Sequence, residues 1–225
     1  MTPRVVAIVP AAGSGSRLQT REKKPFVRLG DRPLVIHTLK ALASSGYINT
    51  IIVATNASST ERLKKLVKKY RINKVAAVTA GGSTRSGSVR NCFKFIKEPC
   101  DIVLIHDGAR PFPSKEVIKN SVLLAKKYGA CITAVRQTDT VKLADKDLFI
   151  SKTLDRSDLW RAQTPQVFKY GLLKRALKAA DSVRDMTDDA SYVERIGGKV
   201  KILEGSAKNI KITTKDDLKI AEVLL

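Results

Sequence analysis

The strongest constraint on the fold is the alternation of two kinds of segment along the chain. Short runs of apolar and β-branched residues, typical of buried strands, are separated by segments whose apolar residues recur with a helical period. Because such strands are apolar almost throughout, both faces of their sheet must be covered. The pattern therefore predicts an α/β fold with a mostly parallel sheet and helices on both faces. The predicted strands are Arg4–Pro10, Ile48–Thr55, Lys74–Thr79, Asp101–His106 and Ala130–Arg136.

Capping residues mark several helix boundaries. Ser83 precedes apolar residues with helical spacing and is predicted to cap a helix. Ser114 is predicted to cap the next helix, which should end at Gly129. Thr214 and Asp217 match a capping box at the start of a final helix.

The alternation breaks between Gln137 and Phe168, where short β-like pieces surround a turn at Ala144–Lys146. This stretch is neither rich in Gly and Ser nor low in complexity, so it is interpreted as an excursion from the sheet and not as a linker. No internal repeat or second domain is visible. The 225 residues are therefore predicted to form a single domain, residues 1–225, with an excursion at about 137–168.

Composition limits the possible partners and compartments. The net charge of +21 suits a polyanionic ligand or a lysine-rich solvated surface, and the solvated surface is favoured for most of the charge. Aromatic residues make up only 5% of the chain and do not alternate with basic ones, so no nucleic-acid partner is expected. No apolar run is long enough to span a membrane. Three scattered cysteines predict a cytoplasmic protein without a redox or metal motif.

Open parallel sheets bind ligands at the carboxyl ends of their strands. In this chain the loops at those ends are residues 11–24, 79–88, 107–111 and 136–142. The first loop carries Gly13 and Gly15, which allow a close approach of the backbone to a ligand. Four cationic residues follow, at Arg17, Arg21, Lys23 and Lys24.

The glycine loop matches neither of two familiar phosphate-binding motifs. Leu18 stands where the dinucleotide fingerprint needs its third glycine, and the Gly-Lys-Ser/Thr end of a P-loop is absent. A tight structural turn with cations on a mobile surface loop remains an alternative. The functional interpretation is a site where cations neutralise a triphosphate during substitution at phosphorus.

The ordered set of motifs along the chain resembles the 2-C-methyl-D-erythritol 4-phosphate cytidylyltransferase family. These motifs are "PAAGSGSR…KKPF", "GGSTRSGSV", "HDGARPF", "DTVK", "TLDRSDLWRAQTPQVF", "TDDAS" and "NIKIT". The resemblance extends from Val6 to the last helix. It implies a Rossmann-like nucleotidyltransferase fold with a protruding β-arm that reaches into a partner in a homodimer. It also implies transfer of a cytidylyl group from CTP to a polyol phosphate, with magnesium or another divalent cation as cofactor.

The resemblance also implies a role for individual residues. Catalytic roles fall to Arg17, Lys24, Arg156 and Lys211. Nucleotide contacts fall to Pro10, Ala11, Ala12, Gly13, Gly15, Gly82, Ser83, Arg85 and Ser88, although some relatives carry an acid at the position of Ser83. Contacts to the second substrate fall to Asp107, Arg110, Thr140, Arg156, Thr164, Thr187 and Lys211, and Asp107 is also the metal ligand.

Physical chemistry supports these roles unequally. Asp107 follows a buried strand, where its carboxylate suits magnesium or caps a turn. Arg156 and Lys211 suit a phosphate monoester or belong to the solvated surface. Thr187 can cap a helix that starts at "DDAS", whose Asp188 and Asp189 suit a first turn.

Three other functions fit the sequence less well. A ribitol 5-phosphate cytidylyltransferase shares the glycine loop, but "TDDAS" and "TLDRSDLW" favour methylerythritol phosphate. A basic RNA-binding protein lacks recognition motifs here, and a Rossmann oxidoreductase lacks its third glycine. No covalent nucleophile motif is visible, so direct in-line attack on the α-phosphorus of CTP is expected.

Overall fold

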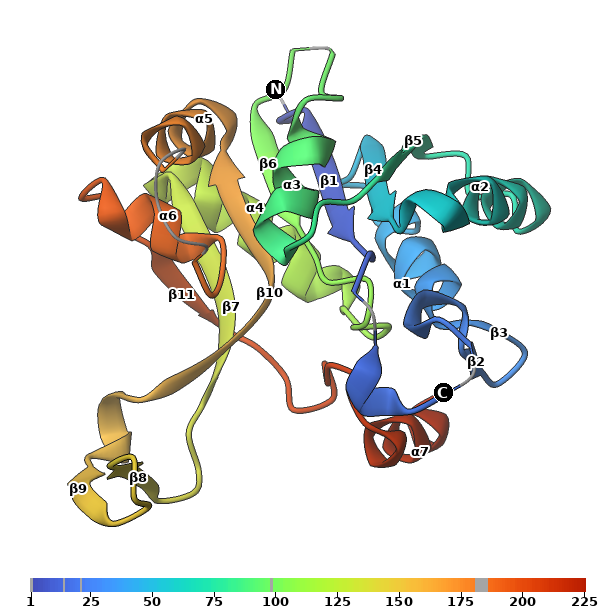
Figure 1. Cartoon of the computed structure of the whole chain (residues 1–225). Helices are drawn as coiled ribbons and strands as arrows, with labels where there is room; N and C mark the ends of the chain where they lie inside the picture. The colour runs from blue at the N-terminus through green and yellow to red at the C-terminus, as the bar shows by residue number, and fades with distance from the viewer. Residues whose placement is uncertain (1, 14, 21, 98, 181–185) are drawn as a thin grey trace.

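A computed structural model describes residues 2–13, 15–20, 22–97, 99–180 and 186–225. Its centre is a seven-stranded sheet with strand order β11-β7-β10-β6-β1-β4-β5 (Figure 1). Strand β10 runs antiparallel to both of its neighbours, and the other paired strands are parallel. The mostly parallel α/β sheet expected from the sequence is confirmed. The strands of this sheet are β1 (Val5–Pro10), β4 (Thr50–Thr55), β5 (Val75–Ala80), β6 (Ile102–Ile105), β7 (Ala130–Arg136), β10 (Trp160–Lys169) and β11 (Lys201–Glu204).

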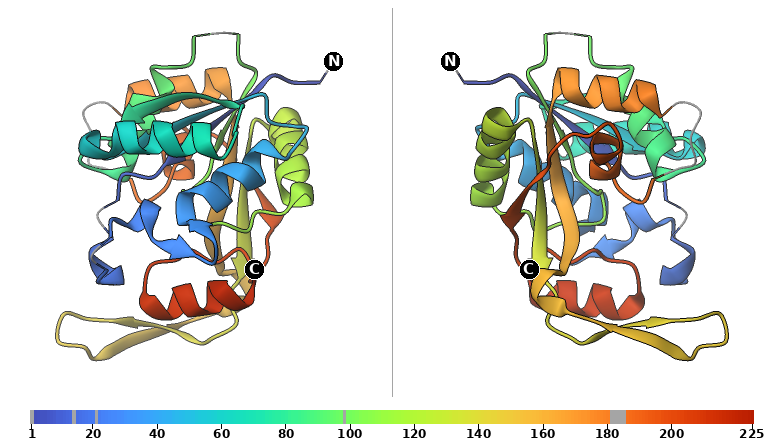
Figure 2. Two further views of the ribbon diagram at one scale, coloured as in Figure 1. Left: turned by 90° about the vertical axis from the view of Figure 1, so that its right-hand side faces the viewer. Right: turned by 90° about the vertical axis from the view of Figure 1, so that its left-hand side faces the viewer.

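Helices cover both faces of the sheet, as Figure 2 shows from two sides. Apolar residues of α1, α2 and α4 pack on one face with alternate residues of the strands. Residues of α3, α5 and α6 pack on the other face. The helices are α1 (Leu34–Ala43), α2 (Thr60–Lys69), α3 (Arg85–Phe93), α4 (Lys115–Tyr128), α5 (Tyr170–Ala179), α6 (Ala190–Arg195) and α7 (Lys215–Val223).

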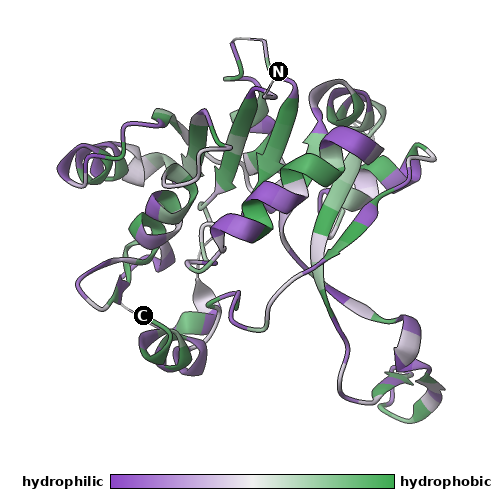
Figure 3. Cartoon of the chain, turned by 180° about the vertical axis from the view of Figure 1, so that it is seen from behind, coloured by the Kyte–Doolittle hydropathy of each residue, from purple (hydrophilic) through white to green (hydrophobic). Residues whose placement is uncertain are grey.

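Strand β1 explains why the predicted strands lack alternation between apolar and polar residues. Val5, Ala7 and Val9 belong to one apolar cluster, whereas Val6 and Ile8 belong to the cluster on the opposite face. Both sets are buried. The central strands are accordingly apolar in Figure 3. Burial on two faces fixes the strand in place, and its carboxyl end therefore presents the glycine loop at a defined position.

The excursion from the sheet is shorter than the sequence predicted. Residues 160–168, assigned to it, lie in β10 and pair with β6 and β7. The part that leaves the sheet is a hairpin of β8 (Val141–Ala144) and β9 (Ile150–Leu154), followed by a short 3-10 helix, η4 (Arg156–Asp158). Figures 1 and 2 show this hairpin, the β-arm, standing clear of the sheet. Asp145 closes its turn by accepting hydrogen bonds from the backbone of Asp147 and Phe149.

The caps predicted at Ser83, Ser114 and Thr214 compare with the structure as follows. Ser114 caps α4, which ends at Gly129, and Thr214 forms a capping box with Asp217 at α7, as expected. The prediction for Ser83 is wrong, because Thr84 caps α3 by accepting a hydrogen bond from Gly87.

A further apolar cluster lies beside α7 and includes Leu18, Leu29, Leu34, Ile212 and Ala221. Within the described residues, no helix is long and apolar enough to cross a membrane.

Thr187 is exposed and does not cap α6. Asp189 occupies the N-cap position, and its neighbour Asp188 contacts the first turn, because one carboxylate oxygen of Asp188 accepts hydrogen bonds from the backbone and hydroxyl of Ser191. The other oxygen accepts one from the side chain of Gln166 on β10. The start of α6 is therefore attached to the central sheet.

Candidate active site

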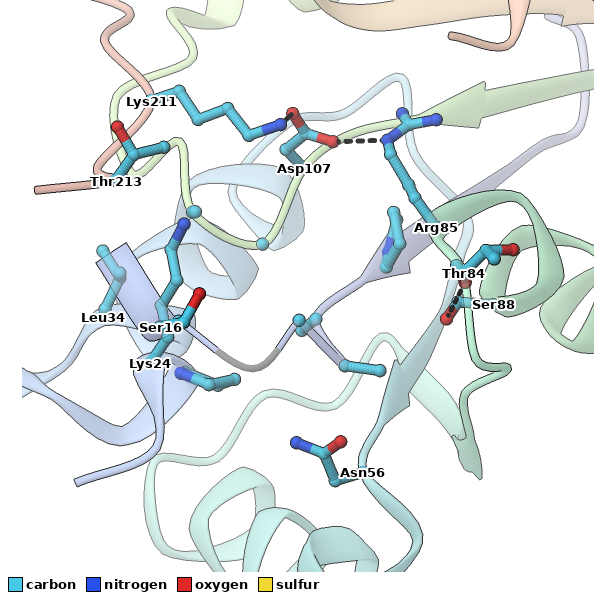
Figure 4. Close-up of a pocket in the computed structure, with 18 of the residues that line it drawn as sticks. Ser16, Lys24, Leu34, Asn56, Thr84, Arg85, Ser88, Asp107, Lys211 and Thr213 are labelled. Carbon is cyan, nitrogen blue, oxygen red and sulfur yellow. Dashed lines mark hydrogen bonds and ion pairs between the residues drawn. The ribbon is translucent and has the colours of Figure 1, made fainter. Parts of the chain in front are cut away.

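A cavity of about 490 Å³ opens at the carboxyl ends of β1, β4, β5 and β6 (Figure 4). This is the edge of the sheet that the strand rule indicated, and the volume suits a small ligand. Thirteen of the predicted site residues line it: Pro10, Ala11, Ala12, Gly13, Gly15, Arg17, Lys24, Gly82, Ser83, Arg85, Ser88, Asp107 and Lys211. Ser14 and Arg21, which belong to the predicted glycine loop, lie outside the described residues.

Glycines allow the loops around this cavity to approach one another. Gly15 has a left-handed φ of 73°, and a Cβ there would lie 2.6 Å from the Cβ of Lys24. A Cβ on Gly82 would lie 2.8 Å from the backbone carbon of Gly87. The hydroxyl of Ser88 accepts a hydrogen bond from the backbone N–H of Gly82 at 3.2 Å. These contacts fold the glycine loop against Lys24 and hold the loop after β5 against α3.

Asp107 is the only acidic residue among the described lining residues, and cations surround it. Its Oδ1 lies 3.0 Å from Nε of Arg85, and its Oδ2 lies 2.9 Å from Nζ of Lys211 and 3.6 Å from Nε of Arg110. Burial alone would raise the pKa of Asp107, but these cations outweigh it and hold the pKa well below its ordinary value. The carboxylate is therefore ionised at any physiological pH, and it takes part in ion pairs and not in a turn cap.

Lys24 has an unusual protonation equilibrium. The pKa of Lys24 is lowered to about 8, mainly because the amine is buried. The positive charge of nearby Lys211 lowers this pKa by more than the negative charge of Asp107 raises it. Arg17 also lowers the pKa of Lys24. The cavity therefore concentrates more positive charge than its single carboxylate balances, and an anion bound there would raise the pKa of Lys24 again.

A chain of hydrogen bonds holds Asp107 from below. Burial lowers the pKa of His106 to about 4, so its ring is neutral. Its Nε2 lies 3.0 Å from the carbonyl oxygen of Arg110 and must carry the proton, because a carbonyl only accepts. Nδ1 then accepts from the hydroxyl of Thr164 at 3.1 Å, and Thr164 accepts from the backbone N–H of Asp107 at 3.1 Å. The direction of each bond in this chain is thereby fixed.

Five residues predicted for the second substrate do not line the cavity. Arg110 and Thr164 are buried beneath it, where Arg110 donates to the carbonyl of Asn209 at 2.7 Å. Thr140 and Arg156 are exposed on the β-arm, and Arg156 donates to the carbonyl of Thr138. Thr187 is exposed next to α6. Of the residues predicted for that substrate, the cavity of this single chain contains Asp107 and Lys211.

Several lining residues were missed. Asn56 follows β4, so the rule that found the other loops would have found it as well. Thr213 lies two residues after Lys211, and its hydroxyl donates to Asp217 at 2.6 Å. The role of Asp189 was also missed: it was assigned to a helix first turn, yet it is buried and its Oδ2 lies 2.7 Å from Nη2 of Arg85.

The donor set restricts how a metal ion can bind. Within the described residues, no group of three or more His, Cys, Asp or Glu side chains is placed to hold one. Asp107 offers one carboxylate, which its cationic partners already contact. Magnesium often binds through one or two carboxylates together with phosphate oxygens and water, so the cavity fits a metal that arrives with a phosphorylated ligand.

The charges indicate the chemistry that this cavity can support. Among the described lining residues, four are cationic (Arg17, Lys24, Arg85 and Lys211) and one is acidic. None is a histidine or a cysteine. Such a set suits a ligand with several negative charges, and it suits reactions in which negative charge moves from one oxygen to another.

Comparisons with known proteins agree with this geometry. The model of the family IspD: 2-C-methyl-D-erythritol 4-phosphate cytidylyltransferase matches residues 5–225. A relative with that enzyme name from Alkaliphilus metalliredigens (strain QYMF) is 43% identical over 224 residues, which cover 99% of this chain and 93% of the relative. Another relative with that enzyme name, from Geobacillus kaustophilus (strain HTA426), is 45% identical over 220 residues, which cover 97% of this chain and 96% of the relative.

Solved structures give the same result. A 4-diphosphocytidyl-2C-methyl-D-erythritol synthase from Anaerococcus prevotii DSM 20548 superposes with a TM-score of 0.87 at 31% identity, covering 99% of this chain and 96% of that one. The 2-C-methyl-D-erythritol 4-phosphate cytidylyltransferase of Francisella tularensis has a TM-score of 0.83 at 35% identity, and the match covers 99% of this chain and 100% of that one. The chain therefore belongs to the 2-C-methyl-D-erythritol 4-phosphate cytidylyltransferase (IspD) family.

Proposed function

We propose that the protein transfers a cytidylyl group from CTP to 2-C-methyl-D-erythritol 4-phosphate, giving 4-diphosphocytidyl-2-C-methyl-D-erythritol and diphosphate. The observation that carries this proposal is the cavity at the strand ends, which four cationic side chains and one carboxylate line among the described residues. Membership of the family supports methylerythritol phosphate over ribitol 5-phosphate as the acceptor. The three cysteines are free thiols, which supports the proposal of a cytoplasmic setting.

The reaction is a direct in-line substitution. A phosphate oxygen of the acceptor forms a bond to the α-phosphorus of CTP, and the bond from that phosphorus to the oxygen shared with the β-phosphate breaks. The electron pair leaves with diphosphate. Because a phosphate monoester is already largely ionised at neutral pH, the attack needs no general base. Lys24 and Arg17 stabilise the charge that builds on the triphosphate during this step.

The nucleotide is proposed to lie across the loops after β1 and β5. The glycine loop, with Pro10, Ala11, Ala12, Gly13 and Gly15, takes the phosphates, and Gly82, Ser83 and Ser88 frame the base and ribose. The positions of all these residues around one cavity support this assignment. Magnesium, or another divalent cation, is proposed to neutralise the triphosphate when bound, with Asp107 as its protein ligand.

Residues of two chains are proposed to form the binding site of the second substrate. Lys211 and Asp107 face it from the cavity, and Arg110 and Thr164 support Asp107 from below. Thr187 approaches from the start of α6. Thr140 and Arg156 would come from the β-arm of the partner in a homodimer. The exposed apolar side chains on the arm support this arrangement, because pairing with a second subunit would cover them.

The test is a diphosphate-release assay with CTP and either polyol phosphate. We expect turnover with methylerythritol phosphate, at least tenfold lower kcat/KM with ribitol 5-phosphate, and loss of activity with a divalent-metal chelator. Each result follows from the proposed roles of the acceptor site and of the metal. Equal turnover with both acceptors would overturn the assignment of the substrate.

Binding of CTP should take up a proton at alkaline pH. The pKa of Lys24 is about 8 in the free cavity, and a bound triphosphate favours the ammonium form and raises that pKa. Uptake should therefore be about three-quarters of a proton per site at pH 8.5 and about a tenth at pH 7. Calorimetry of CTP binding in buffers with different ionisation enthalpies measures it. Lys24→Arg, which stays charged throughout this range, should remove the uptake; unchanged uptake would assign the proton to another group.

A further inference from the structure

Asp189 is a buried carboxylate that the proposed reaction does not use. It immediately precedes α6, and only 1% of its surface is exposed. Its Oδ2 forms an ion pair with Nη2 of Arg85 at 2.7 Å, and among the described residues neither of its carboxylate oxygens has a well-aligned hydrogen-bond partner. Burial raises the pKa of Asp189 above its ordinary value, and Arg85 opposes this shift as the cation that favours the ionised carboxylate.

Arg85 connects this carboxylate to the cavity. Its Nε donates to Oδ1 of Asp107 at 3.0 Å, while its Nη2 faces Asp189. Figure 4 shows the side chain of Arg85 extending from the start of α3 toward Asp107. One planar guanidinium therefore spans two buried acids that come from separate elements, the end of β6 and the start of α6. This geometry engages Arg85 with an acid along two edges of its guanidinium, at the wall of the cavity.

The backbone of Asp189 is itself fixed to the sheet. The side-chain oxygen of Gln166 on β10 accepts hydrogen bonds from the backbone N–H groups of Asp189 and Ala190, at 3.0 and 3.1 Å. The amide nitrogen of Gln166 donates to Asp188 at 2.8 Å. Hydrogen bonds thus attach the backbone of Asp189 to the central sheet, while its side chain contacts Arg85.

We propose that Asp189 is a positioning residue that acts through Arg85 to orient Asp107. By holding one end of the guanidinium, it keeps Nε on Oδ1 of Asp107. The other oxygen of Asp107, Oδ2, is then directed toward Lys211 at 2.9 Å and toward the ligands of the cavity. The consequence for catalysis rests on the proposed function. The ion pair itself does not, and it can be tested separately.

The first test is Asp189→Asn, which removes the charge with little change in shape. We expect kcat/KM for the polyol phosphate to fall by about tenfold or more, because a misplaced site group is costly even when it is present. The dissociation constant of CTP should change by less than about threefold, since the glycine loop does not contact Asp189. Asp189→Glu, which keeps the charge, should retain more of the activity than Asp189→Asn does.

The decisive test repeats Asp189→Asn in an Arg85→Gln background. If Asp189 acts only through Arg85, the second substitution should lower kcat/KM by less than about twofold. It should also raise the melting temperature above that of Arg85→Gln alone, by about 2 °C or more, because it removes a buried acid that has lost its partner. If Asp189 had a merely structural role, Asp189→Asn would lower kcat/KM by the same factor in both backgrounds.

Asp188→Asn is the matched control. Asp188 is the adjacent acid at the same helix start, yet its partners are Ser191 and Gln166 and not Arg85. Its effects should therefore add to those of Arg85→Gln without coupling. Equal losses for Asp189→Asn in the two backgrounds, or wild-type kinetics in the single variant, would overturn the proposal. Inactive wild-type protein would instead contradict the proposed function, and the melting temperatures would still test the ion pair.

Discussion

Replacing Lys24 with alanine should lower kcat by about a hundredfold or more while the protein stays folded, and Arg17→Ala should do the same. Both side chains line the cavity, and the proposed reaction builds negative charge on the departing diphosphate beside them. Contacts that strengthen as this charge develops stabilise the transition state more than the ground state, so their loss appears mainly in kcat.

The fold should survive these substitutions because other side chains anchor the loop. Leu18 and Phe26, close to Arg17 and Lys24 in the chain, are buried in apolar clusters. Arg17 itself is exposed. Removal of Lys24 also removes an ammonium group that burial disfavours, as its lowered pKa shows. Thermal melting should therefore change little in either variant.

Steady-state kinetics with diphosphate release as the readout measures the effect, and Lys23→Ala is its control. Lys23 is the neighbouring cation, but its Nζ donates to Ser58 at 2.7 Å and it does not line the cavity. Its removal should leave kcat within about twofold of the wild type. Near-wild-type turnover of Arg17→Ala or Lys24→Ala would remove that residue from the mechanism.

The sequence predicted the strands made mostly of apolar residues and missed those that carry several polar or charged residues. The five expected strands appear as β1, β4, β5, β6 and β7, within a few residues of the predicted bounds. Strand β10 was assigned to the excursion because Gln163, Thr164 and Gln166 interrupt its apolar pattern. Those polar residues are buried, and each makes hydrogen bonds that only the folded chain provides. The exposed strand β11 carries too few buried residues to show a strand pattern.

The candidate site was predictable where one rule places its loops, since the carboxyl ends of parallel strands meet at one edge. Contacts between side chains far apart in the sequence could not be predicted. Nothing local in the chain pairs Arg85 with Asp189 or Arg110 with Asn209, because tertiary packing alone brings those segments together. Arg110 and Thr164 were assigned to the substrate from the resemblance alone, and their contacts with Asp107 became visible only in the structure.

The second large loss of activity is expected from a substitution on the β-arm. Leu148 and Phe149 at its tip are 85% and 72% exposed, and Leu143 and Ile150 on its strands are exposed as well. Contact with a second subunit would bury this apolar surface, and a two-fold axis would place each arm against the other chain. Arg156 lies at the base of the arm and does not line the cavity of its own chain. If it completes the partner's site, Arg156→Ala should be as inactive as Lys24→Ala.

Mixing these two inactive variants should restore activity. In a heterodimer, one site combines the body of the Lys24→Ala chain with the arm of the Arg156→Ala chain and carries both lesions, and the other site is intact. Random exchange of equal amounts makes half of the dimers heterodimers, so about a quarter of the wild-type activity should return. Lys24→Ala mixed with Arg17→Ala is the matched control. Both of these lesions lie on the body, every site keeps one of them, and no activity should return. Complete subunit exchange between Lys24→Ala and Arg156→Ala without recovered turnover would show that Arg156 does not act across the interface.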